Sequence, residues 1–193
     1  MPSRSRGRRR GFRHRGASLK HRHRVASPMG DVPDDDPFAR VLAIQADFVD
    51  KLTELEATLD EMIATREARE ENGIILDESV RFFEEELLPQ LRAEDEVILP
   101  RLEAAIGRFG TLVNVVAYEH DEIRRGVEKF KAAREILAAQ PSWEAIQETN
   151  RHGIFLVQFL WDHFRKERVS LYPTARERLP ASALQAIRER FAH

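Results

Sequence analysis

The chain has 193 residues, of which 42 % are apolar and 33 % are charged, and this length and composition suit one domain with a continuous core. It contains no cysteine, which excludes disulfides, thiolate metal sites, iron–sulfur clusters and cysteine nucleophiles, so any metal would have to be bound by histidine, carboxylate or amide groups. No apolar run approaches the roughly 18 residues that a membrane-spanning helix needs, and glycine and proline occur only nine times each. We therefore expect a soluble, cytoplasmic and mostly helical protein without a membrane partner.

Positive charge is concentrated at the start of the chain. Residues 1–28 contain nine arginines and Lys20 but no Asp or Glu, and because this segment contributes +10 to the net charge of −2, the rest of the chain carries −12. The segment has no apolar periodicity, so we expect residues 1–36 to form a disordered basic tail and an acidic linker. The acidic body argues against nucleic acid as the main partner.

Three interpretations of this tail are open. Arg9-Arg10-Gly11-Phe12 is similar to a twin-arginine export signal, but the apolar stretch that such a signal requires does not follow. A basic arm that contacts nucleic acid or acidic lipid is a second interpretation. The one we favour is that the folded domain begins near Met29 and that the tail is an upstream extension.

The first two long helices are predicted from apolar periodicity. Apolar residues at steps of three and four predict an amphipathic helix over residues 37–69. Asn72-Gly73 is expected to break this helix, and Asp77 is expected to cap a second one that runs to about Gly107. Pro89 lies inside the second helix and should bend it just before Gln90.

The third helix should begin after Gly110 and end before Pro141, and the fourth should begin at a Ser142 cap and stop before Pro173. A short fifth helix is expected near residues 182–192, within a terminal segment 179–193. Four long helices with short connections predict an all-α, up-down-up-down four-helix bundle over residues 37–178.

The two helical hairpins resemble one another, which indicates an internal repeat. An offset of 73 residues aligns the second helix with the fourth, and an offset of 75 aligns the first with the third. Each hairpin then supplies one polar residue from its first helix and a polar-x-x-x-Glu pair from its second, whose members share a helix face. Buried polar groups need partners or an ion, and facing helices commonly build metal centres in bundles. The inward polar residues are Gln45, Gln90, Glu94, His120, His163 and Glu167.

At these positions the sequence resembles the hemerythrin-like, or HHE cation-binding, family. The phrases ELLPQLRAEDEVILP, YEHDEIR and HFRKERVSLYP carry the resemblance, which covers about residues 37–178. It implies a four-helix bundle with an oxo-bridged di-iron centre that serves oxygen binding, nitric oxide or peroxide handling, or iron sensing. The family pattern takes one His from the first helix, His-x-x-x-Glu from the second, one His from the third and His-x-x-x-Glu from the fourth. Gln45 and Gln90 replace the first two histidines, and the matching residues are Glu94, His120, His163 and Glu167.

The two replacements predict a degenerate di-iron site. In the family each hairpin tends to supply the histidines of one metal, so both losses would fall on the same ion. A Gln amide oxygen is a neutral, weak donor, whereas imidazole suits iron and zinc. We therefore expect one iron ion, or Mn or Zn, with Gln45 and Gln90 as weak ligands or hydrogen-bonding neighbours, and O₂, NO or peroxide as the small ligand. The expected metal ligands are His120, His163, Glu167 and Glu94.

Two other functions are left open by the sequence. The polar residues could form a metal-free hydrogen-bonded network in a bundle that acts as a scaffold or regulatory partner. The basic tail could instead tether the bundle to nucleic acid. Redox turnover at the metal is possible, but no Gly-x-Ser-x-Gly turn or phosphate-binding glycine loop indicates a hydrolase or a nucleotide-dependent enzyme.

The remaining candidate residues receive simpler interpretations. His152 lies too far along its helix from His163 to share an ion and should be solvated or hydrogen-bonded. Tyr118 and Tyr172 could approach the centre, although packing is the commoner role of such aromatics. The acidic runs Glu84–Glu86 and Asp95–Glu96 are assigned mostly to the solvated face.

Overall fold

The computed structural model of this protein describes residues 36–192. The tail and most of the acidic linker predicted for residues 1–36 lie outside the described residues, as does His193.

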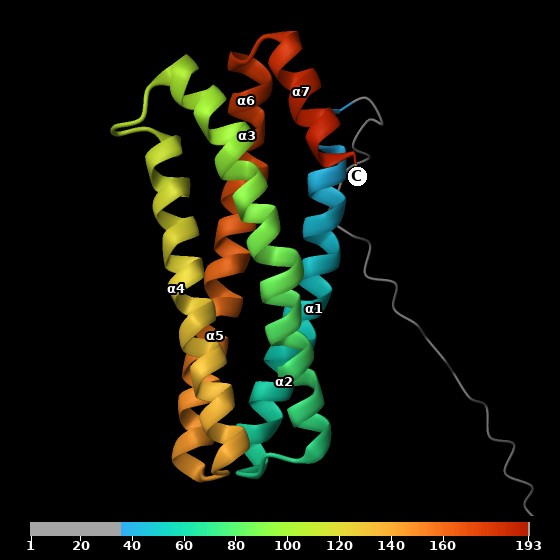
Figure 1. Cartoon of the computed structure of the whole chain (residues 1–193), viewed down its shortest axis with the longest axis vertical. Coiled ribbons are helices and arrows are strands. Elements are labelled where there is room, and N and C mark those ends of the chain that lie inside the picture. The colour runs from blue at the N-terminus through green and yellow to red at the C-terminus, as the bar shows by residue number, and fades with distance from the viewer. Residues whose placement is uncertain (1–35, 193) are drawn as a thin grey trace, which may run out of the picture. The chain divides into compact units, whose positions relative to one another are not determined.

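Every element between residues 36 and 192 is helical. In Figure 1 the chain descends along α1, rises along α2 and α3, descends along α4, and rises again along α5 and α6 before α7 folds back beside the bundle. This arrangement confirms the predicted up-down-up-down bundle with a short C-terminal helix. No helix of this region is both long enough and apolar enough to cross a membrane. The elements are α1 Ala39–Thr65, α2 Glu70–Phe82, the π-helical segment η1 Phe83–Leu87, α3 Leu88–Ile106, α4 Leu112–Ala139, α5 Trp143–Lys166, the π-helical segment η2 Glu167–Leu171, α6 Tyr172–Arg178 and α7 Ala181–Phe191.

The connection between α1 and α2 differs from the prediction. The chain leaves α1 through Arg66, whose φ of 59° places it in the left-handed region that ends many helices. The Asn72 side chain accepts the backbone N–H of Arg69 at 2.9 Å and so supports the first turn of α2. The predicted break at Asn72-Gly73 and the predicted cap at Asp77 are therefore wrong, because both positions lie inside α2.

A π-helical segment precedes each of two prolines, Pro89 and Pro173. In both segments the residue before the proline donates its backbone N–H to a carbonyl five positions earlier: Leu88 to Phe83, and Tyr172 to Glu167. Proline lacks an N–H and its ring crowds the carbonyl four residues back, and a wider turn accommodates both effects without ending the helix. The distortion expected at Pro89 thus takes the form of η1. The prediction that the fourth helix stops before Pro173 is wrong, because it continues into α6.

The core consists of two apolar clusters with a polar layer between them. Along α4, Val116 belongs to one cluster and Ile123 to the other, and His120 lies between them. Along α1, Val41 and Phe48 are divided in the same way on either side of Gln45. The six inward polar residues named from the sequence are all buried and form this layer. The bundle therefore encloses its polar groups between two water-excluding cores.

Gly153 lies in α5 and permits this helix to pack closely against α1. This contact joins the first and the last long helix of the bundle. A Cβ atom at this position would lie 2.5 Å from Leu59 Cδ1 and 3.0 Å from Phe130 Cε2, and both of those side chains are fully buried. We expect Gly153→Ala to lower the free energy of unfolding by about 1–3 kcal/mol through overpacking. Urea denaturation monitored by circular dichroism would measure this change.

Gly73→Ala is the matched control. Its Cβ would approach only the end of the Arg134 side chain at 3.4 Å, so the substitution should be neutral or stabilise α2 by up to about 1 kcal/mol. Equal unfolding midpoints for the two variants would contradict the close packing of α5 against α1.

Candidate metal centre

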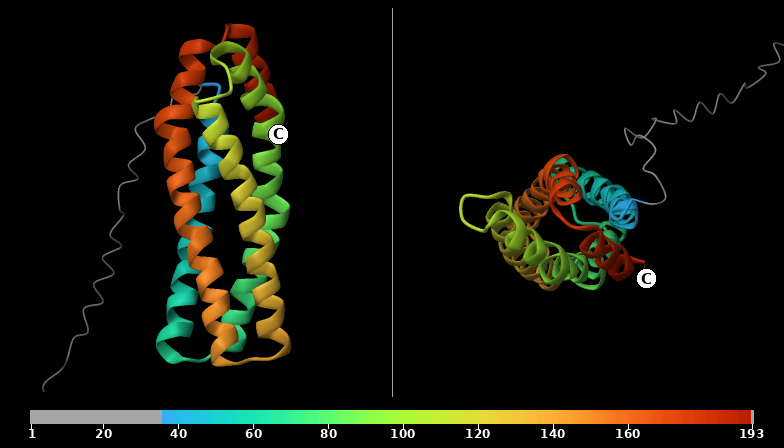
Figure 2. Two further views of the ribbon diagram at one scale, coloured as in Figure 1. Left: turned by 90° about the vertical axis from the view of Figure 1, so that its left-hand side faces the viewer. Right: turned by 90° about the horizontal axis from the view of Figure 1, so that it is seen from above.

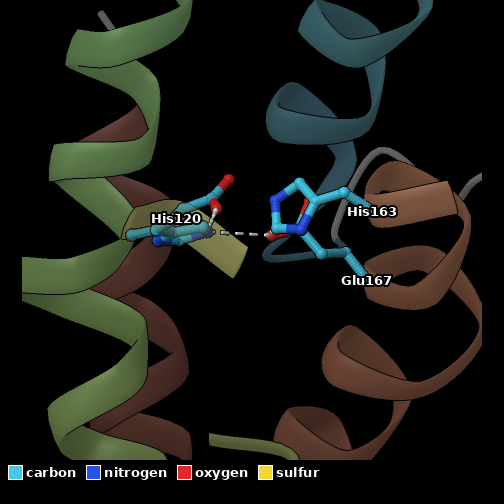
Figure 3. Close-up of side chains that lie close together, drawn as sticks. His120, His163 and Glu167 are labelled. Atoms are coloured by element: carbon cyan, nitrogen blue, oxygen red, sulfur yellow. Dashed lines mark ion pairs between the residues drawn. The ribbon is translucent and has the colours of Figure 1, made fainter. Parts of the chain in front are cut away.

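Four of the six predicted polar residues converge on one point in the bundle. One ligand atom from each of these residues lies within 4.8 Å of the others, and all four side chains are fully buried. Figure 3 shows the His120 imidazole pointing across the interior toward His163 and Glu167. His120 comes from α4, and the other residues come from α3, the end of α5 and the start of η2. The four residues are Glu94, His120, His163 and Glu167.

Each imidazole is oriented by a carboxylate on its outer side. His120 Nδ1 lies 2.6 Å from Asp95 Oδ1, and His163 Nδ1 lies 3.0 Å from Glu119 Oε2. A carboxylate in this position accepts a hydrogen bond from Nδ1–H, which in a neutral imidazole leaves the lone pair on Nε2. The two ring centroids are 4.9 Å apart. Both histidines therefore point Nε2 into the same interior space, where it could bind a metal.

The two outer carboxylates are themselves paired with cations. Arg124 forms an ion pair with Asp95, and Lys166 forms one with Glu119. The acidic runs were assigned mostly to the solvated face, and Asp95 is the exception among them, with a side chain that is only 29 % exposed. Glu119 was missed altogether. In both cases the residue is the chain neighbour of an inward ligand candidate and bonds a histidine on the adjacent helix, which sequence periodicity does not reveal.

The inner atoms of the four residues lack hydrogen-bond partners. Within residues 36–192, no such partner exists for Glu94 Oε2, His120 Nε2, His163 Nε2 or Glu167 Oε1. His120 Nε2 lies 3.5 Å from Glu94 Oε2, and His163 Nε2 lies 3.3 Å from Glu167 Oε1. A buried polar atom without a partner costs about 1–3 kcal/mol. Four such atoms at one point form a donor set of two nitrogens and two oxygens that could hold a cation.

The outer oxygens of the two carboxylates have several donors. Gln90 Nε2 donates to Glu94 Oε1 at 2.8 Å, and Gln45 Nε2 donates to Glu167 Oε2 at 2.6 Å. The Tyr172 hydroxyl lies 3.2 Å from each of these oxygens and accepts from Gln45 Nε2 at 2.8 Å. The two glutamines therefore act as hydrogen-bond donors, and they form a network with the Tyr172 phenol on the outer side of the two carboxylates.

The π-helical turn explains why Tyr172 reaches the centre. In a regular α-helix, residues five apart point about 140° away from each other around the axis. In η2 the wider turn brings Tyr172 back over Glu167, whose carbonyl accepts the Tyr172 N–H. The ring of Tyr172 also stacks on Phe38 with centroids 4.7 Å apart. Phe38, just before α1, and the wide turn η2, before α6, therefore hold the Tyr172 phenol between the two carboxylates.

Burial and charge perturb the acid groups of the centre. Burial, together with the nearby charge of Glu167, raises the pKa of Glu94 to about 7. Burial also acts to raise the pKa of Glu167, but the adjacent imidazoles of His163 and His120 outweigh it and hold that pKa well below its usual range. For His120, burial is outweighed by Asp95 and the ligand carboxylates, which raise its pKa well above the usual value. In the metal-free centre, these pKa shifts favour a proton on His120 and, below about pH 7, one on Glu94 as well.

The other sequence candidates lie outside the centre. Tyr118 is 60 % exposed and does not approach it. His152 Nε2 lies 3.0 Å from Glu148 Oε1, in agreement with its predicted hydrogen-bonded role. Glu84–Glu86 and Glu96 are exposed as expected.

The fold and the cluster together define an all-α bundle with a candidate cation site in its core. Comparison with protein families gives the same result: residues 36–175 match the family described as Hemerythrin HHE cation binding domain. The chain therefore belongs to the hemerythrin family. A search of curated proteins found no match to this sequence.

Metal affinity at this centre should increase with pH. A divalent ion has to displace the protons that Glu94 and His120 hold in the metal-free protein, so its apparent affinity should rise about tenfold per pH unit for each proton displaced. Below about pH 7 the Glu94 proton adds to this slope, and above that value its contribution disappears. Competition titration with Co²⁺ between about pH 6 and pH 8 would measure the slope. A flat profile would contradict the assigned protonation, and Glu94→Gln should reduce both affinity and slope.

Proposed function

We propose that this protein is a hemerythrin-like metal-binding protein whose core holds one divalent ion, most suitably Fe²⁺. His120 and His163 would bind it through Nε2, and Glu94 and Glu167 through Oε2 and Oε1. The observation that carries this proposal is that these four atoms are fully buried, converge on one point and have no hydrogen-bond partners within the described chain. In a metal-free scaffold, the alternative function, these four atoms would have only one another, with His120 Nε2 3.5 Å from Glu94 Oε2 and His163 Nε2 3.3 Å from Glu167 Oε1.

Charge balance supports one ion in preference to two. The ligand carboxylates contribute two negative charges, which a single divalent cation neutralises. The charges behind the histidines are already balanced, because Asp95 pairs with Arg124 and Glu119 pairs with Lys166. A second divalent ion would leave an uncompensated charge in a buried layer, which is costly.

The geometry on the other side of the carboxylates also disfavours a second ion. There the outer oxygens of Glu94 and Glu167 accept hydrogen bonds from Gln45, Gln90 and Tyr172. N–H and O–H groups that point at these oxygens place partial positive charge where a second cation would lie. Burial and the two carboxylates also raise the pKa of Tyr172 well above its usual value, which keeps the phenol protonated and a donor.

The donor set supports the choice of metal. Two imidazole nitrogens and two carboxylate oxygens suit Fe²⁺, and Mn²⁺ or Zn²⁺ can use the same ligands. A bound Fe²⁺ would supply an open coordination position for O₂, NO or peroxide. The protein's residues would fix the two imidazoles through Asp95 and Glu119, hold the carboxylates through their outer oxygens, and exclude bulk water with the two apolar clusters. We propose iron binding with sensing or handling of a small oxidant as the function.

Metal stoichiometry tests this proposal directly. After anaerobic reconstitution with Fe²⁺ and removal of excess metal, elemental analysis should give one iron per chain. His120→Ala combined with His163→Ala should reduce the value to near zero, because both nitrogen ligands are lost. His152→Ala, which changes a histidine outside the centre, should retain one iron. A wild-type value near zero would refute the metal-binding proposal.

Restoring the first hairpin's histidines tests the asymmetry of the site. We expect Gln45→His with Gln90→His, combined with Tyr172→Phe to remove the competing phenol, to bind a second iron and to show the near-ultraviolet absorption of an oxo-bridged iron pair. Tyr172→Phe alone should retain one iron and serves as the control. Two irons and the same absorption in the wild-type protein would show that the asymmetry is wrong.

A further inference from the structure

The bundle is least tightly closed between α1 and α3. Within the described chain, α1 packs mainly on α5 and α2, α3 packs on α4, and α1 and α3 contact one another only sparsely. The C-terminal helix α7 contacts both of them, and Figure 2 shows it beside α1 and α3 at one end of the bundle. The other side of the centre is closed by the close packing of α4 on α5.

A groove of about 310 Å³ opens along this α1–α3 seam at the end of α7. Its walls are largely apolar and come from Ile44, Phe48, Ala93 and Phe191, and Glu86 and Arg190 are exposed at its edge. The volume of the groove suits a small molecule. An uncharged molecule loses little hydration free energy in a largely apolar groove, whereas an ion loses a great deal, so the groove favours uncharged molecules.

The groove reaches the proposed metal centre through one side chain. Gln90 lines the groove and is 8 % exposed, and its Nε2 atom donates to Glu94 Oε1 at 2.8 Å. Glu94 itself is fully buried. Gln90 therefore separates the groove from a carboxylate whose other oxygen faces the metal position.

We propose that this groove is the entrance through which small uncharged molecules reach the centre, and that Gln90 is the side chain that moves to admit them. Within the described residues, the bond to Glu94 is the one side-chain hydrogen bond of Gln90, so rotation of a single side chain would open the path. The groove is therefore a path that Gln90 closes until its side chain moves. This inference rests on the proposed function, because it needs a metal at the centre.

The test uses nitric oxide as the uncharged probe and the full-length protein loaded anaerobically with Fe²⁺. The rate of nitrosyl formation would be followed by stopped-flow absorption. Ile44→Trp places an indole in the groove from α1 and should slow association by about tenfold. The matched control is Ile75→Trp, which makes the same change in a separate groove between α1 and α2 beside Phe82, and it should leave the rate unchanged.

Phe191→Ala tests the same path in the opposite direction. It removes a wall of the groove contributed by α7 and should accelerate association, so the inference stays testable if Ile44→Trp does not fold. Iron content is measured for every variant before mixing. A wild-type chain that binds no iron would refute the proposed function and the entrance with it. Iron-loaded variants with equal rates, or iron-loaded wild type that forms no nitrosyl, would overturn the entrance alone.

Discussion

Two buried carboxylates, Glu94 and Glu167, each divide their oxygens between two environments, and the rest of the centre depends on this division. The outer oxygens accept hydrogen bonds from Gln45, Gln90 and Tyr172, whereas the inner oxygens face two imidazole nitrogens and lack hydrogen-bond partners within residues 36–192. Fully satisfied buried polar groups stabilise a unique core, and unsatisfied ones destabilise it. We therefore propose that the outer side serves hydrogen bonding and that the inner side holds a cation.

The fold holds this arrangement by surrounding a polar layer with two apolar clusters and by distorting two helices at defined points. The wide turn η2 allows the chain to pass Pro173 and also turns Tyr172 toward Glu167. Phe38 at the start of α1 stacks on the same tyrosine. Asp95 and Glu119, which bond the outer nitrogens of the histidines, form ion pairs with Arg124 and Lys166. These ion pairs neutralise the two carboxylates behind the centre. Residues in several helices thus set the positions, the protonation and the charge of the side chains at the centre.

Sequence periodicity predicted the helical bundle and the six inward polar positions because a repeat of 3.6 residues reports the buried face of a regular helix. It failed where helices depart from that repeat or where contacts cross between helices. The position of Tyr172 depends on a π-helical turn, and the bond from His120 to Asp95 joins two helices. Asn72 next to glycine resembles a turn in sequence, but its side chain supports the start of α2. These three features depend on contacts between residues of different helices or turns, which the spacing of residues along the sequence does not reveal.

The central claim is that one ion lies on the inner side of the carboxylates and none on the outer side. Anomalous X-ray scattering at the iron edge, on crystals of the iron-reconstituted protein, tests it most directly. We predict one anomalous peak about 2.0–2.3 Å from His120 Nε2 and His163 Nε2 and from the inner oxygens of the two glutamates. Two peaks about 3.5–4 Å apart, as in a two-metal centre, or one peak beside Gln45 and Tyr172, would contradict the account.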